Sequence, residues 1–233
     1  MASLPGWMPI LLDRINWGCS TSPWFIDLAD EKKIYERGRS ILFDLRPYIR
    51  ELPRNISAVK QALPERMEAA RNLLTQLSDD ERKYQSLFKN QFELVNLTVE
   101  EVEAAPIHES TQALCNMMIE MCQRRSYVEG IHAIVAAELV ATMYSRSSLP
   151  SYEKFFSPPA YQPELIEDGL AWVRLHAKTH TRHAIWMKRM LCDVEDYSGN
   201  EIPEAAEEIL SAFMRVWQCP AEESRLPSPV EVL

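Results

Sequence analysis

Three of the chain's five histidines fall in one short segment, RLHAKTHTRHAIW, at residues 174–186. They are His176, His180 and His183, at successive spacings of four and three residues. On an α-helix, residues i, i+4 and i+7 lie on one face. If the segment is helical, the three imidazole rings therefore form a single stripe that could hold a metal ion.

The face that carries the histidines is expected to turn toward the protein interior, because the residues one turn before and after the stripe, Trp172 and Met187, are apolar. Neutral imidazole is a common ligand for Zn, Cu and Fe. A bound metal also removes the cost of burying unpaired polar rings. Two hypotheses stay open, a metal site and a polar stripe whose rings hydrogen-bond to carbonyl and carboxylate groups.

Glu138 is a second candidate, because it lies within IHAIVAAELVATMY (residues 131–144), the most apolar segment with helical character. Its helical neighbours, from Ile134 to Thr142, include no basic residue. A carboxylate in such a place is costly unless a positive group meets it. A metal ion or a protonated histidine would serve, whereas a position at the edge of the bundle would let the carboxylate reach water.

Glu81 and Tyr84 are candidates from SDDERKYQSLF (residues 78–88). The spacing Glu81-x-x-Tyr84 places both side chains on one helix face, as in the Glu-x-x-His motif of carboxylate di-iron bundles. The same glutamate is also explained by the capping-box spacing Ser78-x-x-Glu81, which predicts a helix that begins near Ser78. Glu81 is therefore either a metal ligand or a capping residue.

The composition argues against several classes of function. A net charge of −9 and a pI near 5.2 disfavour nucleic acid and anionic membrane surfaces as partners. No segment approaches the roughly 20 apolar residues that span a bilayer, and the N-terminus does not resemble a signal peptide. The five cysteines lack the density and spacing of a disulfide framework, so we expect a cytoplasmic protein with reduced thiols.

The elements that must position these residues are predicted to be helices only. Apolar residues recur at spacings of three and four, and no segment alternates as a strand would. We expect an all-α single domain of about seven or eight helices. An irregular arm is predicted over 1–22, the helical bundle over 23–220 and a loose tail over 221–233.

Several helix boundaries are predicted from local signals. The capping boxes Thr98-x-x-Glu101 and Ser126-x-x-Glu129 each indicate a helix start. Pro47 predicts a kink or break in the helix that begins near residue 34. One long helix is expected over 164–191.

Three segments, ERKYQSLFKNQFEL, EGIHAIVAAELVATMY and WVRLHAKTHTRHAIWM, resemble the heme-oxygenase-like superfamily. Within it, the chain looks most similar to the TenA/PqqC-related branch that contains the CADD-like and UndA-like di-iron oxidases. The branch carries His-x3-Asp-x2-His on a late helix, and here the text is His176-x3-His180-x2-His183. Its bridging glutamate falls on Glu138, its early histidine falls on Tyr84, and Glu81 is the nearest match to its early glutamate.

The resemblance implies an iron-dependent oxidase or oxygenase that uses dioxygen on a small molecule derived from an amino acid or a fatty acid. It implies that Glu138, His176, His180, His183 and Glu81 bind one or two Fe(II) ions per chain. Glu138, His180 and Tyr84 would be the catalytic residues. Phe88, Phe92, Trp172 and Met187 are the candidates for the apolar wall that holds the substrate.

Two departures from the family pattern bear on this implication. His180 stands in place of an aspartate and Tyr84 in place of a histidine, so one of two metal positions would be weak, empty or tyrosine-ligated. The alternative function is a non-catalytic binding or interaction protein that kept the cavity and lost part of the metal site. Members of this fold often pair, and a homodimer is expected.

Overall fold

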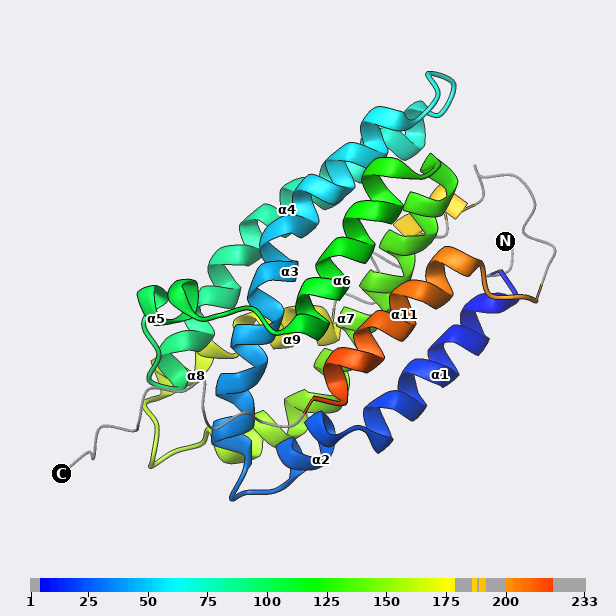
Figure 1. The fold of residues 1–233 in the computed structure, drawn as a ribbon. Helices are drawn as coiled ribbons and strands as arrows, with labels where there is room; N and C mark the ends of the chain where they lie inside the picture. Colours follow the sequence, from blue (N-terminus) through cyan, green and yellow to red (C-terminus); the bar gives the residue numbers. More distant parts are fainter. Residues whose placement is uncertain (1–4, 179–185, 188, 192–199, 220–233) are drawn as a thin grey trace.

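The computed structural model describes residues 5–178, 186–187, 189–191 and 200–219, and all regular structure in these ranges is helical (Figure 1). The all-α prediction is therefore confirmed. The described elements, in chain order, are α1 (Trp7–Thr21), α2 (Pro23–Ala29), α3 (Ile34–Ala62), α4 (Glu68–Leu94), α5 (Val99–Ala104), α6 (Glu109–Ile119), the π-helical turn η1 (Glu120–Arg124), α7 (Tyr127–Phe155), α8 (Pro163–Gly169), α9 (Ala171–Lys178) and α11 (Glu204–Trp217). These described helices outnumber the seven or eight predicted. Three of them, α2, α5 and α8, are only six or seven residues long.

Helix α7 lies at the centre of the bundle. It packs against α1, α3, α9 and α11, while α3 also packs along α4 (Figure 1). Because α7 has neighbours on several sides, it must be apolar around most of its circumference, which is what its sequence shows. None of the described helices has an apolar stretch long enough to cross a bilayer.

The prediction of an irregular arm over residues 1–22 is wrong for residues 7–21, which form α1. Apolar residues at positions 7, 8, 11 and 15 are all buried, and they make one helical stripe against α7. Proline at position 9 does not break this helix, because it lies in the first turn, where backbone N–H groups have no helical acceptor. The helical body thus begins at Trp7 and not at residue 23.

The predicted helix start at Ser78 is also wrong, because α4 runs without interruption from Glu68 to Leu94. Ser78 is buried inside this helix, and its hydroxyl donates to the carbonyl oxygen of Pro53 on α3 at 3.1 Å. Glu81 is consequently not a capping residue. The boxes at Thr98 and Ser126 are confirmed, with both reciprocal hydrogen bonds formed in each.

Two further boundaries differ from the prediction. Helix α3 continues through Pro47, because tertiary packing on this helix outweighs the lost backbone hydrogen bonds. The expected single helix over 164–191 is interrupted at Leu170, between α8 and α9. At Gly169 α8 comes very close to α4, where an added Cβ atom would lie 3.1 Å from Leu94 Cβ.

Candidate functional site

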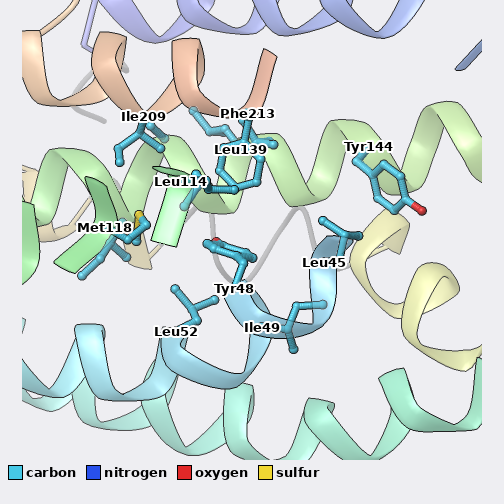
Figure 2. Close-up of a cluster of buried hydrophobic side chains, with 14 of the residues drawn as sticks. Leu45, Tyr48, Ile49, Leu52, Leu114, Met118, Leu139, Tyr144, Ile209 and Phe213 are labelled. Atoms are coloured by element: carbon cyan, nitrogen blue, oxygen red, sulfur yellow. The ribbon is translucent and has the colours of Figure 1, made fainter. Parts of the chain in front are cut away.

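A small cavity of about 20 Å³ lies inside the bundle, between α3, α4, α7, α9 and α11. Its wall is mainly apolar and aromatic, with contributions from Leu45, Tyr48 and Ile49 of α3, Tyr144 of α7, Trp172 of α9 and Phe213 of α11. Figure 2 shows the α3 side chains Leu45 and Tyr48 pointing toward the helices that carry Tyr144 and Phe213. The apolar and aromatic lining is of the kind that surrounds small organic ligands.

Three of the predicted metal ligands line this one cavity: Glu81 from α4, Glu138 from α7 and His176 from α9. Each of the three is only 4% exposed. Three helices that are far apart in the sequence thus place two carboxylates and an imidazole at the wall of an otherwise apolar space. Charged groups buried in this way are rare unless they have a function or a partner.

His176 is held in a defined orientation. Its Nδ1 lies 2.9 Å from the carbonyl oxygen of Trp172, one turn earlier on α9, and its ring stacks on the Trp172 indole at 4.1 Å between centroids. A carbonyl oxygen only accepts, so Nδ1 carries the hydrogen and donates it. In the neutral ring the lone pair is then on Nε2, which lies 4.0 Å from Glu81 Oε1.

Glu81 is the polar group of the site whose burial is least offset by hydrogen bonds. No hydrogen-bond donor in the described part of the chain reaches its buried Oε1 atom. Burial, the charge of Glu138 and the charge of Asp80 raise the pKa of Glu81 well above its ordinary value. The carboxylate form is therefore costly here unless a cation is bound beside it.

Two tyrosines add hydroxyl groups to the apolar wall. The side chains of Tyr48 and Phe213 meet edge to face at 5.1 Å between centroids. Burial and the charges of Glu138 and Glu81 raise the pKa of Tyr48 well above 10, so its phenol remains protonated. The hydroxyls of Tyr144 and Tyr152 lie 3.2 Å apart in the same buried region.

The four residues predicted to form the substrate wall are distributed over different places. Trp172 lines the cavity. Phe88 and Phe92 lie in the layer next to it, where the ring of Phe88 contacts the Trp172 indole at 5.6 Å between centroids. Met187 lies at a second packing defect beside the cavity, and Glu138 is part of the wall of both.

His180 and His183 lie outside the described residues. Tyr84 follows Glu81 by one turn on α4, and its ring contacts that of His176 at 5.5 Å between centroids. Within the described ranges, no group of three or more His, Cys, Asp and Glu side chains is arranged to hold a metal ion. The described part of the predicted ligand set is thus gathered at one cavity without forming a complete metal centre.

Sequence reasoning missed most of the aromatic wall, namely Tyr48, Tyr144, Phe213 and Trp217. Their helical spacing indicates only that they are buried. Whether a buried side chain packs against another side chain or borders an open space depends on how five helices meet, and no local pattern encodes that.

The interior cavity in an all-α bundle of this topology is typical of the heme-oxygenase-like fold. The chain belongs to the TENA/THI-4/PQQC family, whose model matches residues 44–223. The superfamily and the broader branch expected from the sequence are thereby confirmed. The narrower likeness to the CADD-like and UndA-like di-iron oxidases stays a prediction.

Solved structures support the fold at low sequence identity. A TenA homologue from Pseudomonas syringae pv. tomato superposes with a TM-score of 0.72 and 15% identity, over 92% of this chain and 89% of that one. A domain of unknown function with a heme-oxygenase-like fold from Shewanella denitrificans gives 0.73 and 14%, over 90% and 88%. A TenA homologue from Pyrococcus furiosus gives 0.60 and 12%, over 91% and 95%. None of the curated proteins compared matches the chain.

Proposed function

We propose that this chain is an iron-dependent oxidase or oxygenase that acts on a small organic molecule in the interior cavity. The observation that carries the proposal is the buried Oε1 of Glu81, which lacks a described hydrogen-bond donor and faces Nε2 of His176 at 4.0 Å. An unprotonated nitrogen and a carboxylate oxygen repel each other unless a cation or a proton lies between them.

The distance between two of the proposed donors is compatible with a shared metal ion. Oxygen and nitrogen ligands bind such ions at about 2.0–2.2 Å, so two donors to one ion lie at most about 4.4 Å apart. The 4.0 Å between Glu81 Oε1 and His176 Nε2 satisfies this limit. Glu138 would supply a second carboxylate, and His180 and His183 the remaining imidazoles.

The orientation of His176 also suits a ligand. Metal-bound histidines usually donate their second ring N–H to a carbonyl or carboxylate, which fixes the tautomer and the plane of the ring. Here the Trp172 carbonyl accepts from Nδ1, and the Trp172 indole holds the ring from one side. Of the two ring nitrogens of His176, this arrangement leaves only Nε2 able to bind a metal.

Fe(II) held by carboxylates and imidazoles would supply the electrons that reduce dioxygen. The protein's own contribution is to exclude water and to orient the substrate. Trp172, Phe213 and Leu45 enclose the cavity, and the protonated Tyr48 phenol can donate a hydrogen bond to a polar group of the substrate. Glu81 and Glu138 would neutralise the charge of the ion in the apolar surroundings.

The wall restricts the class of substrate. No lysine or arginine is among the described residues that line the cavity. A substrate derived from a fatty acid or an amino acid would therefore place its apolar part against the aromatic wall and its polar end toward Glu81, Glu138 and His176. Because the cavity volume is only about 20 Å³, such a molecule would have to displace some of the side chains that line it.

The second candidate function is binding without catalysis. It is favoured by Tyr84 and His180, which stand where the family pattern has a histidine and an aspartate. In that case the two carboxylates and the imidazole would form the polar end of a binding site for an organic ligand.

The test is metal content after anaerobic loading with Fe(II) and removal of free metal. Wild type is expected to retain one or two ions per chain. The variants His176→Gln and Glu81→Gln are expected to retain less than about a tenth of that, because removal of one ligand or of its support weakens binding by one to two orders of magnitude. His132→Gln is the matched control, since it changes a histidine of α7 that is not part of the cavity wall.

Oxygen consumption by the loaded protein provides the second measurement. Iron retained by wild type and His132→Gln but lost from the two site variants supports the proposal. Wild type that retains no iron contradicts it and favours the binding protein. Iron that both site variants keep would place the metal elsewhere in the chain.

A further inference from the structure

A second group of reactive side chains lies away from the interior cavity, where the end of α11 meets the start of α6. Cys219 follows the last turn of α11 and is half-buried. Its Sγ lies 3.1 Å from the hydroxyl oxygen of Ser110 and 3.6 Å from Nδ1 of His108. The Ser110 hydroxyl in turn lies 2.7 Å from His108 Nδ1.

The hydrogen-bond directions in this group follow from one contact. His108 is the N-cap of α6, and its Nδ1 accepts from the backbone N–H of Ser110 at 3.2 Å. Nδ1 therefore carries no hydrogen, so the Ser110 hydroxyl must donate to it. The lone pairs of the Ser110 oxygen are then available to the thiol of Cys219.

The surroundings influence the thiolate in two opposite ways. The N-terminus of α6 presents backbone N–H groups that favour a negative charge on the sulfur. Cys219 itself follows the C-terminus of α11, and its Sγ lies 3.4 Å from the carbonyl oxygen of Arg215, a second acceptor for the thiol hydrogen. A thiol has one hydrogen, so the contact with Arg215 competes with the contact with Ser110.

We propose that Cys219 is a nucleophilic thiol and a site of modification by small-molecule disulfides, with His108 as its base and Ser110 as the proton relay. A nucleophile within hydrogen-bond reach of a base that a third group orients is the arrangement that activates cysteine and serine in proteins. Here the base is oriented by the backbone N–H that it caps.

The reaction balances without a further oxidant. The thiol proton passes to the Ser110 oxygen as the Ser110 proton passes to His108 Nδ1. The Cys219 sulfur then attacks one sulfur of the disulfide, a new S–S bond forms, and the original S–S bond breaks. The departing thiolate takes the proton from His108, so the products are a mixed disulfide on Cys219 and one small thiol.

The position of Cys219 connects this site to the cavity. Its carbonyl oxygen accepts from Nη1 of Arg37, a fully buried residue that also pairs with Asp27. Two residues earlier, Trp217 lines the cavity. A group attached to Cys219 would therefore act on the end of the helix that carries part of the cavity wall.

The test is the alkylation rate of each cysteine by iodoacetamide at pH 7 in the full chain, followed by peptide mass spectrometry. Cys19, Cys115 and Cys122 are internal references, since they are buried and burial raises the pKa of their thiols to about 11, 11 and 12. Cys219 is expected to react at least about tenfold faster than these three.

Two variants distinguish activation of the Cys219 thiol by its neighbours from simple exposure of the thiol to solvent. In His108→Asn the new side chain still caps α6 but cannot take a proton, and the Cys219 rate is expected to fall about tenfold. Ser110→Ala removes the relay and keeps the capping ring, and a similar fall is expected. Circular dichroism melting curves confirm that each variant is folded.

Oxidised glutathione is the second probe, and it is expected to add one glutathionyl group to Cys219 in wild type and much less in His108→Asn. The proposal is overturned if His108→Asn reacts within about twofold of wild type, or if Cys219 is as slow as the three buried cysteines. If Cys219 reacts slowly in His108→Asn but at the wild-type rate in Ser110→Ala, His108 is still the base and the proposed proton relay through Ser110 is wrong.

Discussion

His132 offers a quantitative test of how α1 docks on the bundle. This histidine is on α7, and its ring meets the indole of Trp7 edge to face at 5.9 Å between centroids. Burial lowers the pKa of His132 from 6.5 to about 4, and the charge of Glu129 offsets this only in part. The folded protein therefore holds the ring neutral at pH values where the unfolded chain protonates it.

The sign and size of the effect follow from proton linkage. Because the unfolded state binds more protons between pH 6.5 and pH 4, the free energy of unfolding falls as the pH is lowered through that window. With a shift from 6.5 to about 4, the loss attributable to His132 is about 2 kcal/mol at pH 5 and about 3 kcal/mol at pH 4, relative to pH 7.5.

The assay compares wild type with His132→Gln in urea unfolding at pH 7.5, 6 and 5. Glutamine does not titrate, so the difference in unfolding free energy between the two proteins is expected to shift by about 2 kcal/mol in favour of the variant from pH 7.5 to pH 5. For a chain of this size the same change appears as about 4–8 °C in relative Tm. Between pH 7.5 and 8.5 the difference should stay constant, which serves as the internal control.

A difference that changes by less than about 0.5 kcal/mol between pH 7.5 and pH 5 would refute the reasoning. It would mean that the His132 ring is as well solvated in the folded protein as in the unfolded chain. The contact with Trp7, and with it the docking of α1 against α7, would then be wrong.

Two further predictions concern stability. In metal-free protein, Glu81→Gln is expected to raise the free energy of unfolding at pH 7, because the raised folded-state pKa of Glu81 means that wild type loses stability as the pH rises above 4.5. Urea unfolding in the presence of a chelator measures this, and a less stable variant at pH 7 would contradict it. Gly130→Ala is expected to cost about 1–3 kcal/mol, because the added Cβ would lie 2.5 Å from Cγ2 of Val59 on α3. Thermal unfolding measures the loss, and an unchanged Tm would show that α3 and α7 are farther apart.

Local sequence patterns predict a helix start best where a capping box has both of its partners within one turn. The boxes at Thr98 and Ser126 begin α5 and α7 as predicted, since both partners of each box are within one turn. The same pattern failed at Ser78, where the identical spacing lies inside a longer apolar stripe and the serine bonds to α3 instead. A capping box and a mid-helix pair look alike until the neighbouring helix is known.

Glu81 shows how this ambiguity affected the site. Its spacing from Ser78 explained it as a cap, while its spacing from Tyr84 suggested a ligand. Only the continuity of α4 across Ser78 puts the carboxylate into the interior, beside Glu138 and His176. A buried carboxylate that costs stability and would bind a cation is typical of sites where function outweighs stability.

The sequence by itself determined that the protein is helical and that Glu138 and His176 are unusual, because hydrophobic periodicity and an isolated charge in an apolar helix are local properties. Tertiary structure decided that α1 is part of the bundle, that the cavity is bounded by Tyr48, Tyr144 and Phe213, and that Cys219 lies beside His108. These features depend on contacts between residues that are tens to more than a hundred positions apart. Such contacts form only when whole helices pack, and their energies are not determined by any single segment of the chain.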